Sequence, residues 1–240
     1  PKNYIDTNIT GAMNVLEYCK ESKIKKLIYI MTFSDVSHKF YNGKPILADD
    51  DRSLTLTGDH AVYAISKVAA CDLIEHYHQE YGLQTIIFRI PTVYCADENF
   101  DYYVDGKLKR KAYIQMIESI VNNQKIEIWG NPNHAKDMPY IKDFSRLIHL
   151  GVKHPTAQGI FNAGTDNPIS LTELVDTMIQ VFTSNKDIQK LSCPNKPSQP
   201  NFTFDMSKTN EVFDYKPEWN LKEMLADIRD TLGMEVFIKQ

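Results

Sequence analysis

The sequence lacks several features that mark whole classes of proteins. Its longest apolar runs, such as Leu27–Met31, have five residues, whereas a membrane-spanning helix needs about 20. The four cysteines are far apart, with neither a zinc-ligand spacing nor a dense disulfide framework. Charge of one sign is not in excess, because 27 Lys and Arg residues oppose 31 Asp and Glu residues. A net charge of −4 gives no reason to expect nonspecific nucleic-acid binding.

What is present is the composition of an ordinary folded domain. The 240 residues are 42% hydrophobic and 11% aromatic, which is enough to bury a core and excludes disorder as the main state. Free thiols in apolar patterns and the lack of a secretory signal favour a reducing, cytoplasmic location. The chain begins at Pro1 rather than Met, in what reads as the lead-in to a helix. We therefore expect the first residues of a longer protein to precede it.

The periodicity of apolar residues predicts helices and strands in alternation. Apolar residues spaced by three or four predict helices over residues 8–20 and 60–79. Runs rich in β-forming residues predict strands at 26–31 and 84–90, the second apolar enough to be covered on both faces. Helix–strand–helix–strand order implies a parallel sheet with crossover helices, and hence an α/β fold.

Local signals add detail to this pattern. Thr7 or Asn8 is expected to cap the first helix, and Ser170 to cap a helix that runs to residue 182. Residues 32–58 are polar and read as a long functional loop, since structureless loops of that length are uncommon. Residues 97–110 are also polar and predict no regular element.

Tyr63 and Lys67 are the first candidates for chemistry. Four residues apart on a helix, they share one face. An ammonium group beside a phenol favours the phenolate and lowers the Tyr pKa, so such a pair can move protons near neutral pH. With 13 tyrosines in the chain, the spacing also arises by chance, as for Tyr103 and Lys107. By spacing alone, a solvated helix face is an equal alternative.

The order of short motifs along the chain is more specific than any one motif. The motifs are Asn8-x-x-Gly11-x-x-Asn14, Tyr63-x-x-x-Lys67, Tyr81-Gly82, Phe88-Arg89, Thr92-Val93-Tyr94, Lys136-Asp137, Phe161-Asn162-Ala163-Gly164 and Asp205-x-Ser207-Lys208. Over nearly the whole chain this series resembles the extended short-chain dehydrogenase/reductase family, the NAD-dependent epimerases and dehydratases of nucleotide sugars.

The resemblance implies a fold and a division of the chain. The fold would be the C-terminal part of a Rossmann-type parallel sheet with a small mixed α/β substrate-binding lobe. Residues 1–95 and about 138–163 would form the Rossmann-type part, and about 96–137 and 164–240 the lobe. The family's Gly-x-x-Gly-x-x-Gly loop, which cradles the dinucleotide pyrophosphate, has no counterpart among the ten glycines. We expect it before Pro1, and NAD and NADP stay alternatives because the discriminating strand would lie there too.

The resemblance also implies roles for individual residues. Tyr63 would be the acid/base, and Lys67 would hold the nicotinamide ribose and tune Tyr63. The other cofactor-contacting residues would be Asn8, Ile30, Met31 and Pro91. Substrate-contacting residues would be Phe33, Ser34, Thr92 and Lys136. Lys136 stands where the family often has an Arg that grips the substrate diphosphate, although a surface lysine is an equal alternative.

One departure from the family pattern bears on activity. Phe33 occupies the position where the family usually has a Ser or Thr beside the catalytic Tyr. Its neighbours Thr32 and Ser34 could substitute by a small shift, so Thr32 is the third catalytic candidate. The Asp-Glu pair of the dehydratase branch is Ser34-Asp35 here, which argues against 4,6-dehydration. Losing a transition-state hydrogen bond typically costs on the order of 10²-fold in rate.

These residues support two functions from different classes. The first is an NAD- or NADP-dependent epimerase or reductase that acts on a nucleotide-activated sugar. The second is a non-catalytic relative that binds a dinucleotide or a protein partner, which Phe33 favours and the intact Tyr63–Lys67 pair disfavours. A homodimer through the helices of 8–20 and 60–79 is expected, with no nucleic-acid or membrane partner. No metal site is predicted, because the histidines have no ligand spacing.

Overall fold

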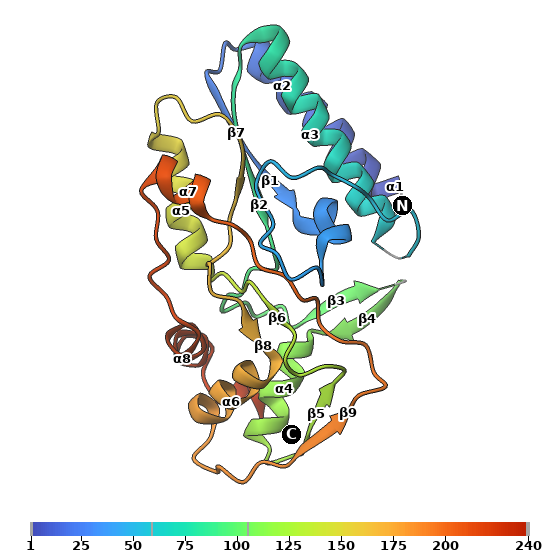
Figure 1. The fold of residues 1–240 in the computed structure, drawn as a ribbon, viewed down its shortest axis with the longest axis vertical. Helices are drawn as coiled ribbons and strands as arrows, with labels where there is room; N and C mark the ends of the chain where they lie inside the picture. The colour runs from blue at the N-terminus through green and yellow to red at the C-terminus, as the bar shows by residue number, and fades with distance from the viewer. Residues whose placement is uncertain (1, 59, 105, 239–240) are drawn as a thin grey trace.

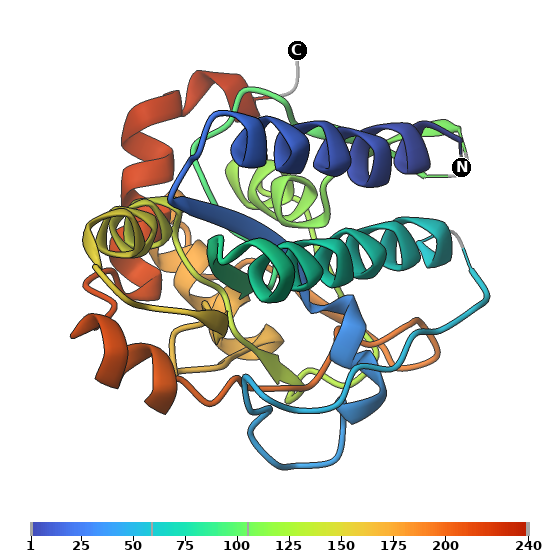
Figure 2. The same ribbon diagram turned by 90° about the horizontal axis from the view of Figure 1, so that it is seen from above.

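The computed structural model describes residues 2–58, 60–104 and 106–238, which leaves Pro1 outside the described residues. A parallel sheet of three strands forms the centre of the upper half of the molecule in Figure 1. In the order β1-β2-β7, the strands are Lys26–Thr32, Gln84–Ile90 and Gly159–Asn162. Helices cover both faces of the sheet, with α2 and α3 on one and α5 and α7 on the other (Figures 1 and 2).

The N-terminal segment is helical from Lys2 onward. The α1 helix Lys2–Tyr4, the π-helical segment Ile5–Thr10 and the α2 helix Gly11–Glu21 follow one another without a break. The prediction that Thr7 or Asn8 caps this helix is therefore wrong, because both residues lie inside the π-helical turn. Thr10, the last residue of that turn, keeps helical dihedrals of −63° and −41°, so the helix continues through it.

The long helix α3, Ala61–Tyr81, lies beside α2 on one face of the sheet (Figure 2). Leu16 and Cys19 of α2 and Cys71 and Ile74 of α3 belong to one buried cluster between the helices and the sheet. The two helices therefore pack side by side on the sheet. Gly82 ends α3 in the left-handed conformation, with φ of +67°, which glycine adopts without strain.

The opposite face of the sheet carries α5, Ile141–Lys153, and α7, Ser207–Phe213. The cluster between them and the sheet is rich in phenylalanine. Phe88 of β2 and Phe161 of β7 both contact the ring of Phe213, with centroids 5.7 and 4.8 Å apart. A Cβ atom added to Gly151 would lie 3.1 Å from the Phe88 ring, so glycine allows α5 to approach the sheet closely.

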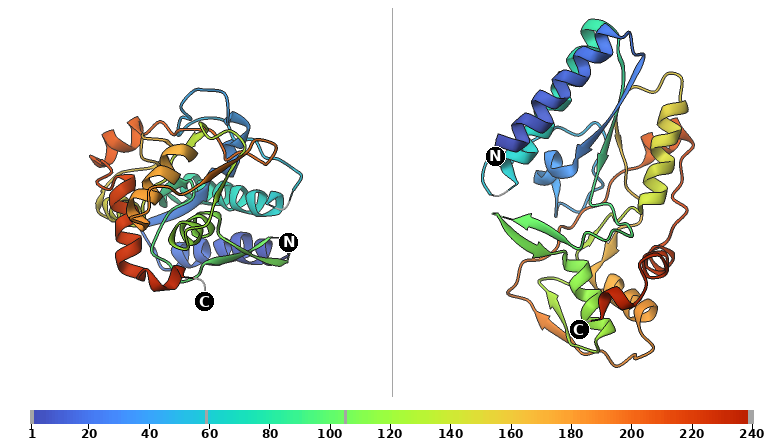
Figure 3. Two further views of the ribbon diagram at one scale, coloured as in Figure 1. Left: turned by 90° about the horizontal axis from the view of Figure 1, so that it is seen from below. Right: turned by 180° about the vertical axis from the view of Figure 1, so that it is seen from behind.

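The second half of the chain forms most of the lower part of the molecule, which is seen from two further sides in Figure 3. Its helices and strands are β3 Asp101–Val104, β4 Lys107–Arg110, α4 Ala112–Val121, β5 Ile126–Trp129, β6 Ala135–Lys136, β8 Ile169–Ser170, α6 Leu171–Phe182, β9 Lys190–Cys193, α8 Leu221–Leu232 and a short 3₁₀ helix Glu235–Phe237. Parallel β5 and β9 pair, as do antiparallel β6 and β8. Isoleucines of α4 and apolar residues of α6 and α8 form a separate core.

Two local predictions have opposite outcomes here. Ser170 caps α6 as predicted, because its side chain accepts a hydrogen bond from the Glu173 N–H. Residues 97–110, predicted to be irregular, contain the antiparallel hairpin of β3 and β4. Charged side chains at exposed positions of β4 replace the alternation of apolar and polar residues that is typical of a strand. The dipeptide Asp105-Gly106 was the sequence signal that favours a hairpin.

In the ranges that the structure describes, no helix is long and apolar enough to cross a membrane. Those ranges also hold no group of three or more His, Cys, Asp or Glu side chains arranged to bind a metal ion.

Candidate functional site

The candidate site lies where β1 and β2 end. Thr32, the last residue of β1, pairs in register with Ile90, the last residue of β2. The carboxyl ends of parallel strands form the edge at which open α/β sheets bind ligands. Thr32 also caps the 3₁₀ helix Phe33–Lys39, since its hydroxyl oxygen accepts a hydrogen bond from the Ser34 N–H at 3.2 Å.

Tyr63, in the first turn of α3, faces this edge. Its hydroxyl lies near the side chain of Thr32, which is itself 5% exposed. The Tyr4 ring from α1 packs edge-on against the Tyr63 ring, with centroids 5.6 Å apart. Burial raises the pKa of Tyr63, and the side chain of Thr32 acts in the opposite direction. The structure thus brings together two of the three predicted catalytic residues.

Lys67 lies one helical turn beyond Tyr63. Its Nζ atom is 4.2 Å from the centroid of the Tyr29 ring, and burial lowers the pKa of Lys67. Burial is the largest influence on the pKa of Tyr63 and raises it, and the lowering of that pKa by Lys67 stays a prediction. Tyr29 was not among the predicted site residues. An aromatic residue among the aliphatic side chains of β1 is the one sequence signal for it.

Asn8 connects the N-terminal helix to the same turn of α3. Its side-chain amide donates a hydrogen bond to the Ser66 hydroxyl at 2.9 Å, and Ser66 donates to the Tyr63 carbonyl oxygen at 2.8 Å. Asn8 lies in the π-helical turn, an irregularity that is frequent at functional sites. Asn8 also lines a pocket of about 400 Å³ that extends along the outer side of β1 to Tyr29.

The other predicted cofactor residues occupy different positions around the edge. Met31 is 1% exposed in the cluster under α2 and α3, whereas Ile30 packs against the cluster on the opposite face of the sheet. Their side chains therefore point to opposite sides of β1. Pro91 and Thr92 directly follow β2, where Pro91 is buried and Thr92 is exposed.

Phe33 packs into an aromatic cluster. Its ring stacks on Phe40 and Phe202, with centroids 5.7 and 5.4 Å apart. Ser34 instead stays at the site, where its hydroxyl oxygen accepts a hydrogen bond from Thr32 at 3.0 Å. Thr32 is therefore the hydroxyl that meets Tyr63, and Phe33 tethers the 3₁₀ helix to the segment that contains Phe202.

The position of Phe33 predicts the effect of removing its ring. Phe33→Ser should destabilise the fold by about 2 kcal/mol without raising turnover, because it deletes a half-buried ring that stacks on Phe40 and Phe202. Urea unfolding and an activity assay measure the two effects, with Phe33→Leu as the apolar control. A serine variant of unchanged stability and higher turnover would contradict this assignment.

Lys136 lies in the short strand β6. It is near Tyr94, which follows the end of β2. Its Nζ atom is 6.0 Å from the centroid of the Tyr94 ring. The adjacent Asp137 is fully buried and accepts hydrogen bonds from the Thr165 N–H at 2.8 Å and from the Phe204 N–H at 2.6 Å. A Cβ atom added to Gly164 would lie 2.9 Å from the Asp137 carboxyl carbon, so this motif glycine makes room for the carboxylate.

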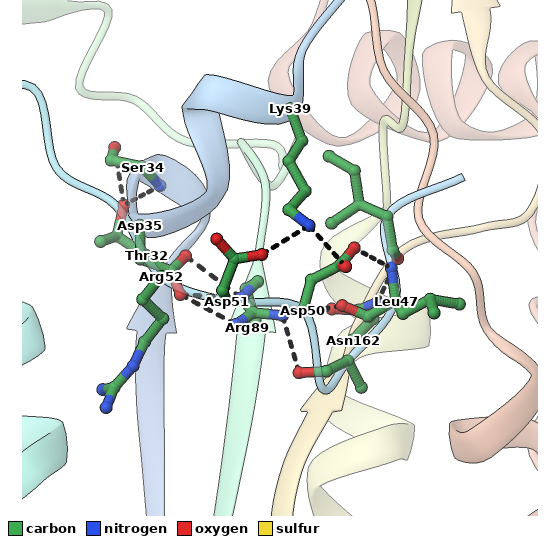
Figure 4. Close-up of polar contacts among 12 residues, drawn as sticks. Thr32, Ser34, Asp35, Lys39, Leu47, Asp50, Asp51, Arg52, Arg89 and Asn162 are labelled. Atoms are coloured by element: carbon green, nitrogen blue, oxygen red, sulfur yellow. Dashed lines mark hydrogen bonds and ion pairs between the residues drawn. The ribbon is translucent and has the colours of Figure 1, made fainter. Parts of the chain in front are cut away.

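A buried ion pair beneath the site was not predicted (Figure 4). Arg89 of β2 and Asp35 of the 3₁₀ helix both have fully buried side chains, and their closest nitrogen and oxygen atoms are 2.8 Å apart. The guanidinium also donates to the carbonyl oxygen of Ala48 at 3.0 Å and to the Asn162 side chain at 3.2 Å. This network joins β2, β7 and the loop after β1. A charged residue within the apolar run that ends β2 was the available sequence signal.

The fold and this site together define an α/β protein with a tyrosine and a threonine at the carboxyl edge of a parallel sheet, and a lysine one helical turn beyond the tyrosine. Residues 1–164 match the sequence profile of the NAD dependent epimerase/dehydratase family, and the chain belongs to that family. The resemblance stated from the motifs is thereby confirmed.

Known proteins similar to this chain include epimerases and dehydratases. A UDP-glucuronate 4-epimerase of Thermodesulfobacterium geofontis (strain OPF15) is 28% identical over 226 residues, which are 94% of this chain and 64% of that protein. A dTDP-D-glucose 4,6-dehydratase of Dictyostelium discoideum is 24% identical over 187 residues, 74% of this chain and 40% of that protein. The chain therefore spans less than two thirds of the length of these relatives.

The fold also matches solved structures. The UDP-N-acetylglucosamine 4-epimerase of Methanobrevibacter ruminantium M1, in complex with UDP-N-acetylmuramic acid, superposes with a TM-score of 0.77 at 19% identity. The match covers 96% of this chain and 71% of that one. It confirms the predicted α/β fold with a Rossmann-type parallel sheet.

Proposed function

We propose that the protein is an NAD- or NADP-dependent epimerase, or a reductase, that acts on a nucleotide-activated sugar. The observation that carries the proposal is that Tyr63 meets Thr32 at the carboxyl end of β1, where the Thr32 side chain lowers the pKa of the Tyr63 hydroxyl. Lys67 lies one turn further along the same helix. A phenol held by a hydroxyl partner in a desolvated site is suited to exchange a proton with a sugar hydroxyl. The relatives named UDP-glucuronate 4-epimerase support UDP-sugars as substrates.

In this proposal Tyr63 takes the proton of a sugar hydroxyl as the carbon that bears it is oxidised, and later returns the proton. Thr32 holds the Tyr63 hydroxyl and shares its hydrogen bond with the sugar oxygen. Lys67 contributes a positive charge that stabilises the phenolate once the site is assembled. In the substrate lobe, proposed to comprise about 96–137 and 164–240, Lys136 offers a cation for the diphosphate.

The residues present fit the nicotinamide end of a dinucleotide. Lys67 offers an ammonium that pairs with no carboxylate among the described residues, Tyr63 offers a hydroxyl, and Asn8 holds the turn that carries both. When bound, the cofactor would supply the hydride acceptor and donor. Pro91 and the backbone at Ile30 and Met31 complete the proposed nicotinamide surroundings.

A panel of nucleotide sugars tests the proposal. The full-length protein, with added NAD or NADP, should convert at least one UDP-sugar to its C4 epimer, detected by NMR of the sugar. Binding of a dinucleotide without turnover of any sugar would instead support the non-catalytic alternative. The raised pKa of Tyr63 is the observation that favours the non-catalytic alternative, because a phenol that keeps its proton is a poor base.

We propose that two copies associate through α2 and α3. Val15 and Tyr18 of α2 are 48% and 62% exposed, and residues three apart share one side of a helix. An apolar strip of this kind on a helix surface favours burial against a partner.

The proposed cytoplasmic location is consistent with four free cysteines in the described structure.

The dimer predicts an effect of charge on α2. Val15→Asp combined with Tyr18→Asp should convert a dimer into a monomer, because a carboxylate in an apolar interface is costly to desolvate. Sedimentation of the full-length protein measures the mass. The control Tyr103→Asp changes a residue of the β3–β4 hairpin that is 71% exposed, and it should leave the dimer intact. A monomeric wild-type protein would refute the proposal.

A further inference from the structure

Lys67 makes two contacts with a single residue of the neighbouring strand. Its Nζ atom lies over the Tyr29 ring at 4.2 Å from the centroid. The Tyr29 hydroxyl donates a hydrogen bond of 3.3 Å to the carbonyl oxygen of Lys67 itself. One side chain of β1 therefore holds both the ammonium group and the backbone of this turn of α3.

In the part of the chain that the structure describes, the Lys67 ammonium contacts the Tyr29 ring and forms no ion pair with a carboxylate. Burial lowers the pKa of Lys67, because a charged amine loses its hydration. A cation within about 6 Å of an aromatic centroid is attracted by the negative face of the ring, more strongly when it is desolvated. That attraction offsets part of the lost hydration and keeps the amine charged.

Other groups near the pair do not take over this role. The ionisable groups around Lys67 and Tyr29 are Cys71 and Tyr63 on α3, with His60 and Tyr4 against the Tyr63 ring. Burial raises the pKa of the Cys71 thiol to about 12, so it is neutral at physiological pH. Asp35, Asp72 and Glu75 act on Cys71, and none of them acts on Lys67. The nearby Asn8–Ser66 contact is uncharged.

Tyr29 also differs from its neighbours in the strand. The residues on either side of it in β1, Ile28 and Ile30, are aliphatic, and Met31 on its own face is buried. Tyr29 is half-buried and lines the pocket beside β1 together with Asn8. A residue needed only to fill space at this position would require neither an aromatic face nor a hydroxyl.

We propose that Tyr29 is a positioning residue for the Tyr63–Lys67 pair, which holds the Lys67 ammonium in place through its ring and keeps it charged. As a role in catalysis this rests on the proposed function, whereas the effect on Lys67 does not. The ring face is the essential part, and the hydroxyl adds a tether to the backbone.

Competitive acylation tests the inference directly. The full-length protein is treated with trace acetic anhydride across a range of pH, and mass spectrometry of the Lys67 peptide gives the pKa of that amine. Tyr29→Phe keeps the ring and should leave the pKa of Lys67 nearly unchanged. Tyr29→Leu should lower the pKa of Lys67 by about one pH unit. At a given pH below the pKa, this corresponds to a neutral fraction of Lys67 about tenfold larger.

Two further variants distinguish a loss of the ring's electrostatic effect from a general loss of folding. The isosteric 3,4,5-trifluorophenylalanine, placed at position 29, weakens the negative ring face without changing its shape, and should lower the pKa of Lys67 as Tyr29→Leu does. Tyr81→Leu removes the ring under Lys20, whose Nζ atom is 4.7 Å from its centroid, and should leave Lys67 unaffected. An unchanged Lys67 titration in both the leucine and the trifluorinated variants would overturn the inference.

The pH profile of turnover provides the functional arm. If Lys67 must be charged, the alkaline limb of kcat/KM should move to lower pH in Tyr29→Leu by the same amount as the Lys67 titration. It should stay in place in Tyr29→Phe. Should no variant or wild-type protein turn over any sugar, the proposed function fails, and the acylation result still decides the effect of Tyr29 on Lys67.

Discussion

Tyr63→Phe should lower kcat for the sugar substrate by about 10³-fold, the largest effect on activity that the structure leads us to expect. The substitution deletes the hydroxyl that lies near the Thr32 side chain and keeps the ring that packs against Tyr4. Because the proposed proton transfer uses that hydroxyl, the loss should fall on kcat, with little change in KM or in unfolding temperature. Steady-state kinetics and thermal unfolding of the full-length protein measure these quantities.

Thr32→Val is the companion variant, since valine is similar in shape and lacks the hydroxyl. It should reduce kcat by on the order of 10²-fold, and Ser34→Ala by much less, because Ser34 contacts Thr32 rather than Tyr63. If Tyr63→Phe keeps turnover within about tenfold of the wild type, the role proposed for Tyr63 is wrong. If Ser34→Ala lowers kcat as much as Thr32→Val does, the assignment of Thr32 as the hydroxyl that assists Tyr63 is wrong.

Arg89→Met should reduce the free energy of unfolding by about 3–5 kcal/mol, the largest effect on stability that we expect. The substitution leaves the fully buried Asp35 carboxylate without its cation. It also removes the donors to the Ala48 carbonyl and the Asn162 side chain. Burial raises the pKa of Asp35, and the Arg89 charge opposes that rise, so the unpaired carboxyl should take up a proton or bring in water. Urea unfolding at neutral pH measures the loss.

Two controls separate the buried charge from the packing of the side chain. The double variant Arg89→Met with Asp35→Leu removes both charges and should be less destabilised than Arg89→Met alone. Lys190→Met breaks the exposed pair with Asp176, whose side chains are 41% and 44% exposed, and should change stability by less than about 1 kcal/mol. A loss in Arg89→Met no larger than in Lys190→Met would show that the network contributes little.

Much of the fold was determined by local sequence patterns. The strand Gln84–Ile90 and the helix Ala61–Tyr81 follow from runs and spacings of apolar residues within one segment. The same helical spacing puts Tyr63 and Lys67 on one face. Such features depend on residues a few positions apart, whose relation is set by backbone geometry alone.

Contacts between distant segments were decided by the tertiary structure. The chain leaves strand geometry at Thr32 and enters a 3₁₀ helix, which interrupts the alternation of side chains and turns Phe33 toward Phe202. A one-residue change in the position where the strand ends decides which hydroxyl reaches Tyr63. The exact ends of secondary-structure elements are the feature that a sequence pattern predicts least well.

The partners of charged groups also came from the three-dimensional arrangement. Lys67 lies on Tyr29, 38 residues away in the chain, and Arg89 pairs with Asp35 across 54 residues. The sequence by itself determined the α/β fold, the family and the shared helix face of Tyr63 and Lys67, because these follow from short-range spacing and motif order. Which groups neutralise the buried charges depends on how β1, β2 and α3 pack, and only the tertiary structure decided that.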